Sequence, residues 1–436
     1  MTVQAFTKML KQGIDYEEKH AGTVRWNAIK VLFAVAVQYD LDIWTIDIKT
    51  FFLYGILPKS DTVYMEIPEG WEEEGVDRKA FVWELQRSLY GMPQAPHLAQ
   101  KALRSALVAE NTFVASSADD CVYVTRDSKS GYAASGTHVD DEIVIGDPRG
   151  VKKAIDTLEK KFKITHTKNP SVITGVQIER NRPKRWLKLH QGAYTKSILE
   201  KFRMADARPV DTPMDPGTAK LLMTLPTEHS TPASCLQYQR IVGALMWLLR
   251  TRPDLHFTIN LLCRFLKNAT PEHVAIARAR PFRYLAGTPN YGIVFYPGKG
   301  NAGDGEWCLS GSCDADLAGD VKTSRSTIGG TLQLGRYGNV ACRSSLEKKI
   351  CTSTGQSETY ACSSLGKEVI WTRHLLRDLL CPQRKPTGVQ TDNDGVFKQS
   401  TKAINHATAK HYRIAQAFIR QICSTLIMKM LRVDHA

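Results

Sequence analysis

The chain has 436 residues and a formal net charge of +14, from 58 Lys and Arg against 44 Asp and Glu. This length predicts two to four folded units, each able to bury its own core. The positive charge favours a polyanionic partner, although a basic soluble protein without such a partner has the same composition. The longest apolar run, Val31 to Val37, is too short to span a membrane, and residues 1–12 hold no apolar signal segment. We therefore expect an intracellular protein that is neither secreted nor bound to a membrane.

The first half of the chain is expected to alternate between helices and strands. Apolar residues at helical spacing and β-branched or aromatic runs distinguish the two types of segment. The predicted helices cover residues 25–39, 99–110 and 151–162. The predicted strands cover residues 43–46, 122–124 and 143–145. Asp47 follows the first strand, and the adjacent pair Asp140-Asp141 between β-prone runs predicts the tight turn of a hairpin.

The second half is predicted to contain a strand pair, a linker and a group of helices. The strands are expected at residues 173–178 and 186–189. Residues 207–232 include five prolines and predict a linker. Helical spacing returns over 236–249 and 255–266, and the Gly-rich stretch 297–305 marks a second break. We infer three domains with boundaries at 1–208, 209–300 and 301–436.

Several blocks in a fixed order identify a family resemblance. Residues 45–52 (Thr-Ile-Asp-Ile-Lys-Thr-Phe-Phe), 88–96 (Ser-Leu-Tyr-Gly-Met-Pro-Gln-Ala-Pro) and 138–141 (His-Val-Asp-Asp) resemble the reverse transcriptase of copia-type LTR retrotransposons. That family carries Asp-Val-Lys-Thr-Ala-Phe, Ser-Leu-Tyr-Gly-Leu-Lys-Gln-Ala-Pro and Tyr-Val-Asp-Asp blocks. Residues 238–255 resemble the segment after the polymerase, and residues 311–320 resemble the opening strand of its ribonuclease H domain. The resemblance covers nearly the whole chain.

The resemblance implies a fold and a set of partners. The expected fold is an α+β polymerase palm with fingers, the right-hand reverse transcriptase, followed by a helical thumb or connection. An α/β ribonuclease H-like domain with a mixed sheet is expected to end the chain. The implied partners are an RNA template, a DNA primer, RNA–DNA hybrid and deoxynucleoside triphosphates, with no membrane partner. Such a protein is expected in a cytoplasmic particle, in the nucleus, or in both.

Three carboxylates, Asp47, Asp140 and Asp141, are the candidate polymerase site. Strand ends that bring them together would offer oxygen ligands to two Mg²⁺ ions, with Mn²⁺ as a substitute. Two such ions about 3.5–4 Å apart activate an attacking hydroxyl and stabilise a leaving pyrophosphate. The resemblance implies that Phe52 abuts the sugar of the incoming nucleotide and excludes a 2′-hydroxyl. It also implies that Gln94 lies near that sugar.

A second acidic set is expected in the last domain. Asp314, Glu358 and Asp392 match the ribonuclease H carboxylates of the family and imply two further Mg²⁺ ions that activate water. We expect Asp314 to end a strand, Glu358 to open a helix and Asp392 to close a strand. Residues 410–414 (Lys-His-Tyr-Arg-Ile) resemble a block that reads Lys-His-Ile-Asp-Ile, so Arg413 stands at the position of a fourth carboxylate. Its guanidinium is expected to repel the metal ions or to pair with one of the acids.

Two interpretations of function remain open. The first is an RNA-directed DNA polymerase with an attached, impaired ribonuclease H domain. The alternative is a degenerate or co-opted copy that binds RNA or RNA–DNA hybrid without catalysis. Arg413 favours the alternative, as does the alignment of residues 4–16 with the end of the fingers, which leaves out a basic strand that contacts the triphosphate. Intact Asp47, Asp140 and Asp141 favour the first interpretation.

Overall fold

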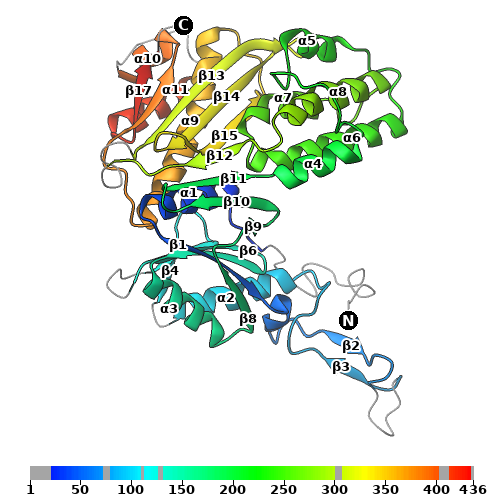
Figure 1. Cartoon of the computed structure of the whole chain (residues 1–436), viewed down its shortest axis with the longest axis vertical. Helices are drawn as coiled ribbons and strands as arrows, with labels where there is room; N and C mark the ends of the chain where they lie inside the picture. Colours follow the sequence, from blue (N-terminus) through cyan, green and yellow to red (C-terminus); the bar gives the residue numbers. More distant parts are fainter. Residues whose placement is uncertain are drawn as a thin grey trace. The chain divides into compact units, whose positions relative to one another are not determined.

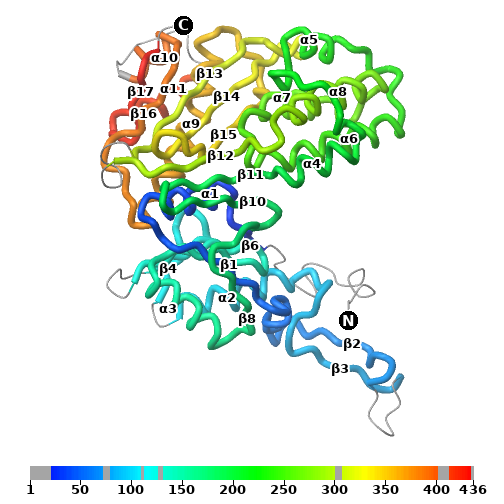
Figure 2. The backbone as a smooth tube through the Cα atoms, in the orientation of Figure 1, coloured from blue at the N-terminus to red at the C-terminus, as the bar shows by residue number. Residues whose placement is uncertain are grey.

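The computed structural model describes residues 21–71, 79–109, 112–125, 131–299, 307–401 and 412–433. They form two compact units: unit 1 holds residues up to 32 and 41–170, and unit 2 holds residues 33–40 and 171 onwards. Figures 1 and 2 follow the chain from its N-terminus to its C-terminus. The predicted end of the fingers at residues 4–16 and most of the break at 297–305 lie outside the described residues. The three-domain division therefore stays a prediction. No helix among the described residues is long and apolar enough to cross a membrane.

Unit 1 is built on a sheet of six described strands in the order β4-β5-β6-β7-β1-β8. The strands are β1 (Asp42–Ile48), β4 (Phe113–Ala115), β5 (Val122–Thr125), β6 (Ala133–His138), β7 (Asp141–Gly146) and β8 (Ile164–Lys168). The predicted hairpin is confirmed, since β6 and β7 pair antiparallel around a turn at Val139 and Asp140. The strand that flanks this turn is β6 and not the predicted strand at 122–124. The Ala- and Gly-containing sequence of β6 carries no β-branched pattern that would have predicted it.

The three predicted helices of unit 1 are confirmed, and the second and third begin earlier than expected. They are α1 (Trp26–Gln38), whose last residues belong to unit 2, α2 (Ala95–Val108), α3 (Pro148–Glu159) and the short 3₁₀ helix η1 (Phe51–Tyr54). A small hairpin joins β2 (Tyr64–Glu66) to β3 (Val82–Glu84). Prolines occupy the first turns of α2 and α3, where a missing N–H removes no helical hydrogen bond. Asp147 caps α3 by accepting hydrogen bonds from two backbone N–H groups.

Unit 2 begins with a sheet of four described strands and a group of helices. The strands are β9 (Val172–Ile173), β10 (Val176–Asn181), β11 (Trp186–His190) and β12 (Gly292–Phe295). The helices are α4 (Gly192–Lys201), α5 (Pro216–Thr224), α6 (Pro232–Met246), α7 (His256–Cys263) and α8 (Pro271–Gly287), with 3₁₀ turns η4 (Trp247–Arg250) and η5 (Pro253–Leu255). The predicted linker is wrong over residues 216–224. Pro216 starts α5 instead of breaking a helix, and Leu222 is fully buried in the core of this helical group.

A buried arginine connects one of the sequence blocks that resemble the family, residues 238–255, to the end of α8. Arg252 is 1% exposed, and its guanidinium forms an ion pair with Asp254 at 2.8 Å. It also donates to the backbone oxygen of Thr288 at 2.9 Å, and the Tyr284 hydroxyl donates to Asp254 at 2.9 Å. The segments at 251–255 and 283–288 therefore meet in one hydrogen-bonded cluster that fixes the end of α8.

The last part of unit 2 is a mixed sheet, as predicted, with the order β15-β14-β13-β16-β17 in the described residues. Its strands are β13 (Leu309–Asp320), β14 (Arg325–Leu334), β15 (Gly338–Leu346), β16 (Thr387–Thr391) and β17 (Met428–Arg432). The first three are antiparallel, whereas β16 is parallel to β13 and β17 is parallel to β16. The helices are α9 (Thr354–Asp378), α10 (Asp394–Thr401) and α11 (Arg413–Ser424). Helix α9 lies beside β13 and β14 (Figure 1), and Gly311 and Gly330 let the Leu365 side chain of α9 approach the sheet closely.

Candidate functional sites

The register of the palm sheet makes neighbours of the predicted polymerase acids. Asp47 of β1 lies directly opposite Asp141 of β7, and the Ile48 N–H donates to the backbone oxygen of Asp140 at 3.1 Å. Residues directly opposite in an antiparallel pair have Cβ atoms about 4.5–5.5 Å apart. Two sequence segments nearly a hundred residues apart thus supply one acidic strand end.

Both negative and positive charges lie close to these acids. Burial first, and then the charges of Asp140 and Asp47, raise the pKa of Asp141, while His138 acts in the opposite direction. Lys49 Nζ lies 2.7 Å from an Asp47 carboxylate oxygen. Within the described residues, the three palm acids do not form a group with one oxygen from each within 4.8 Å of the others. Their arrangement suits oxygen-ligated divalent cations in ligand type, and Lys49 competes for one ligand.

The turn that carries Asp140 holds a strained residue. Val139 has a φ of 61°, a left-handed conformation that β-branched side chains rarely adopt. Such strain persists only where the surrounding structure imposes it, and it is frequent in functional turns. The β6–β7 ladder on both sides imposes it here, because His138 pairs with Asp141.

Phe52 and Gln94 lie in two blocks that contact each other. Phe52 is half-buried on η1, and its ring meets the Tyr90 ring edge-to-face at 5.2 Å between centroids. The Ser88 hydroxyl donates to the Phe52 backbone oxygen at 2.6 Å. Gln94, just before α2, is 2% exposed, yet neither polar atom of its side chain has a hydrogen-bond partner among the described residues. A buried amide without partners is unusual, and a polar ligand would satisfy it.

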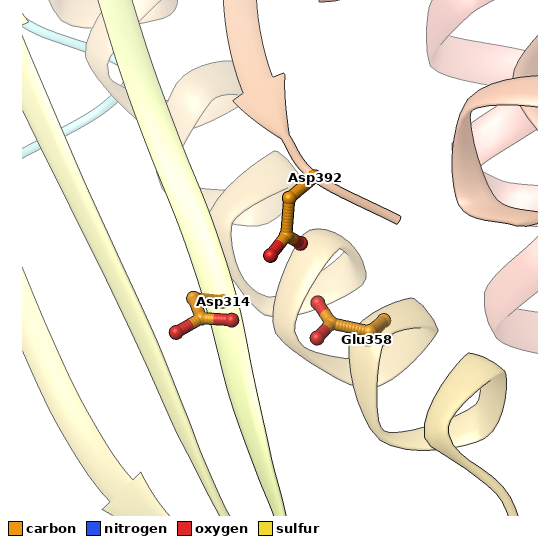
Figure 3. A group of neighbouring side chains, drawn as sticks. All are labelled: Asp314, Glu358 and Asp392. Atoms are coloured by element: carbon orange, nitrogen blue, oxygen red, sulfur yellow. The ribbon is translucent and has the colours of Figure 1, made fainter. Parts of the chain in front are cut away.

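The second acidic set forms a compact cluster in unit 2. Asp314 on β13, Glu358 on α9 and Asp392 after β16 each offer an oxygen, and these atoms lie within 4.8 Å of one another. Figure 3 shows the three carboxylates converging from a strand, a helix and a strand end. All the donors are carboxylate oxygens, which are ligands that Mg²⁺ prefers.

Glu358 is the buried acid of this cluster. It is 4% exposed, and one of its oxygens accepts from the Ala315 N–H at 3.3 Å. The other oxygen is buried and has no hydrogen-bond partner in the described part of the chain. Burial, followed by the charges of Asp314 and Asp392, raises the pKa of Glu358 to about 7. A divalent cation would supply the missing partner and offset the repulsion.

Two of the expected positions of these acids need correction. Asp314 does not end a strand: β13 continues to Asp320, because pairing with β14 extends past Asp314 on an exposed face that tolerates polar residues. Glu358 does not open a helix: Ser353 caps α9 through the Gln356 N–H, which places Glu358 in the second turn. Asp392 follows the last residue of β16, as expected.

Arg413 is exposed and is the first residue of α11. In the part of the chain that the structure describes, Arg413 forms no ion pair with the three acids, so the pairing that we considered is not observed. Its expected effect on the metal ions stays a prediction. Lys410 and His411 of the same block lie outside the described residues.

A groove beside Asp314 was not predicted from the sequence. Its floor is the face of β13, β14 and β15 on which Asp314 lies opposite Gly329, and Gly329 lies opposite Ser344. His256 and Phe257 of α7 line the groove from the helical group. In the sequence, only the alternation of small and polar residues along β13 indicates an open face of the sheet. This pattern does not identify α7 as the opposite wall of the groove.

The first sheet carries acids at a strand end and at a hairpin turn, and a mixed sheet with a three-acid cluster follows it in the chain. This combination defines the class of the protein. It is a polymerase palm joined to a ribonuclease H-like fold. In agreement, the family described as reverse transcriptase (RNA-dependent DNA polymerase) matches residues 1–216.

Relatives in plants match almost the entire chain. It is 32% identical over 429 residues to the retrovirus-related Pol polyprotein from transposon TNT 1-94 of Nicotiana tabacum, covering 97% of this chain and 31% of that protein. It is 32% identical over 425 residues to the corresponding polyprotein from transposon RE1 of Arabidopsis thaliana, covering 97% of this chain and 28% of that protein. The chain therefore spans about a third of the length of these relatives.

The fold also resembles a solved structure. The foamy viral protease-reverse transcriptase in complex with double-stranded DNA aligns with a TM-score of 0.50 at 11% identity, over 99% of this chain and 62% of that chain. At this identity the likeness concerns the fold alone. The chain belongs to the reverse transcriptase family, as the reverse transcriptase region of copia-type retrotransposon Pol polyproteins. The predicted family and fold class are confirmed.

Proposed function

We propose that this chain is an RNA-directed DNA polymerase with an attached ribonuclease H that is slowed by Arg413. The observation that carries the polymerase proposal is the β1–β7 register, which sets Asp47 opposite Asp141 beside the Asp140 turn. The proposed substrates are an RNA template with a DNA primer and deoxynucleoside triphosphates, in keeping with a net charge of +14.

The residues proposed for the polymerase divide into ligands and positioning groups. Asp47, Asp140 and Asp141 would hold two Mg²⁺ or Mn²⁺ ions. When bound, such ions lower the pKa of an attacking oxygen and stabilise the leaving group, here and in the nuclease. Phe52 would close the pocket against a 2′-hydroxyl, and the unpartnered Gln94 amide would bond the nucleotide.

A face of α6 and η4 is suited to a nucleic-acid duplex. Gly243 is exposed, and a side chain at this position would meet nothing within 4 Å. One turn further along, Trp247 is 40% exposed, and the Arg250 guanidinium stacks 3.6 Å from its ring centroid. A bare glycine beside an aromatic ring and a cation allows close approach of a sugar–phosphate surface. We propose that this face contacts the primer–template.

For the nuclease, Asp314, Glu358 and Asp392 would hold the metal ions and direct water to the RNA strand of a hybrid. The groove between the β13–β15 face and α7 would receive the hybrid beside Asp314. Arg343, which lines this groove, supplies a cation for a phosphate.

Primer extension on poly-rA/oligo-dT tests the proposal, using the wild type, Asp140→Asn and Asp141→Asn. Loss of a metal ligand is expected to lower the rate about a hundredfold or more. Asp156→Asn is the matched control, because Asp156 is exposed on α3 and pairs with Lys152 at 3.1 Å. Circular dichroism checks folding. Extension at the wild-type rate by either variant would reject the palm assignment.

The same assay distinguishes polymerase activity from the alternative function, which is nucleic-acid binding without catalysis. The pairing of Lys49 with Asp47 at 2.7 Å favours this alternative, because it occupies a proposed metal ligand. The alternative would be supported if the wild type bound primer–template with a steep salt dependence but extended no primer with Mg²⁺ or Mn²⁺.

A further inference from the structure

A pocket of about 560 Å³ opens in unit 1, and none of the three palm acids lines it. Its walls come from η1, from the segment after η1, from α2 and from the segment that follows α3. The floor residues are apolar or aromatic: Tyr54, Leu57, Leu98 and Phe162. Leu57, Leu98 and Phe162 are each less than 10% exposed, and the Tyr54 and Phe162 rings meet edge-to-face at 4.8 Å. Neither Phe52 nor Gln94 lines this pocket.

The rim of the pocket is strongly basic. Arg87, Lys101 and Lys161 line it, and no acidic residue does. All three cations are exposed, and within the described residues none of them forms an ion pair or a side-chain hydrogen bond. Three unpaired cations around one pocket create a locally positive potential, which raises the local concentration of anions.

We propose that this pocket binds a small planar aromatic anion. The ring would lie on the apolar floor against Tyr54 and Phe162, and its sulfonate, carboxylate or phosphate group would meet the cations of the rim. The volume falls in the range of about 300–1,000 Å³ that is usual for small-molecule sites, and an apolar floor with a few charged groups matches their usual lining. A neutral aromatic compound would gain the floor contacts and lose the ionic ones.

Rigid packing around the floor supports a preformed site. The Tyr54 hydroxyl accepts a hydrogen bond from the Lys163 N–H at 2.8 Å, which fixes the ring that lines one wall. The Leu98 side chain is fixed in the first turns of α2, within an apolar cluster that includes Leu57. Binding of a ligand would therefore cost little conformational entropy, because the pocket is already ordered. This inference does not depend on polymerase activity.

Isothermal titration calorimetry of the full chain with 2-naphthalenesulfonate and with neutral 2-naphthol tests the proposal. The sulfonate is expected to bind at least about tenfold more tightly than the naphthol. The double variant Lys101→Glu and Lys161→Glu should lose at least about tenfold in sulfonate affinity, because both changes reverse the charge of the rim. Both positions are exposed, so folding should be retained, and circular dichroism checks this.

Lys152→Glu is the matched control, since Lys152 is exposed on α3 and does not line the pocket. It changes the net charge in the same direction and should leave the affinity within about twofold. Ala102→Trp, which fills the pocket from α2, should abolish binding of both compounds. Equal affinity for the two compounds, or equal affinity of the wild type and the double variant, would overturn the proposal.

Discussion

Replacing Glu358 with glutamine is expected to stabilise the metal-free protein near pH 8 and to change little near pH 5. Burial and the charges of Asp314 and Asp392 raise the pKa of Glu358 from 4.5 to about 7. Between these two values the folded protein keeps a proton that the unfolded chain has released, so stability falls as the pH rises through this window. Glutamine keeps the shape of the protonated side chain and removes the charge that causes the loss.

The size of the effect follows from the pKa. If the whole rise from 4.5 to about 7 appeared as stability, the penalty would be about 3 kcal/mol at about 1.4 kcal/mol per pKa unit. Asp314 is exposed, so water screens its charge, and we expect about 1–2 kcal/mol. For a unit of a few hundred residues this corresponds to roughly 2–8 °C in melting temperature.

Differential scanning calorimetry with a chelator measures this difference at the two pH values, with Glu368→Gln on the same helix as the control. Added Mg²⁺ should reverse the order near pH 8, because only the wild type retains all three ligands and gains from binding. A variant that melts below the wild type near pH 8 in chelator would refute the reasoning. So would a difference that is the same at both pH values, since it could not come from titration of Glu358.

Phe52→Ala should raise incorporation of ribonucleotides relative to deoxynucleotides by roughly tenfold to two-hundredfold in competitive primer extension, because a steric block is removed; an unchanged ratio would leave Phe52 with a packing role only. Arg413→Asp should increase cleavage of an RNA–DNA hybrid, compared at matched hybrid occupancy, because a carboxylate replaces a cation that repels Mg²⁺. Rapid cleavage by the wild type with no gain in the variant would place Arg413 outside the site. Arg252→Ala should lower the free energy of unfolding by about 3–5 kcal/mol in chemical denaturation, because Asp254 and Thr288 lose a fully buried partner; a loss below about 1 kcal/mol would contradict this.

Features that depend on short-range patterns could be predicted before the fold was known. A hairpin at the Asp140-Asp141 pair could be predicted from the two acids together with the sequence blocks around them, although the turn itself is formed by Val139 and Asp140 and Asp141 already belongs to β7. Helices α1, α2 and α3 could be predicted from apolar spacing, which reflects one face packing on a core. The family could also be recognised from the ordered blocks, because each block is a short stretch of consecutive residues.

Contacts between residues that are distant in the sequence, and the effects of burial on them, depend on the fold of the whole chain. The register that sets Asp47 opposite Asp141 depends on hydrogen bonds between strands far apart in sequence. The raised pKa of Glu358 depends on the packing of α9 against a sheet that also carries Asp314. The proline-rich stretch that predicted a linker forms α5, because Leu222 finds a core that no local pattern reveals. Local preferences are worth a few tenths of a kcal/mol per residue, whereas full burial of a leucine contributes about 2 kcal/mol, so long-range packing decides such segments.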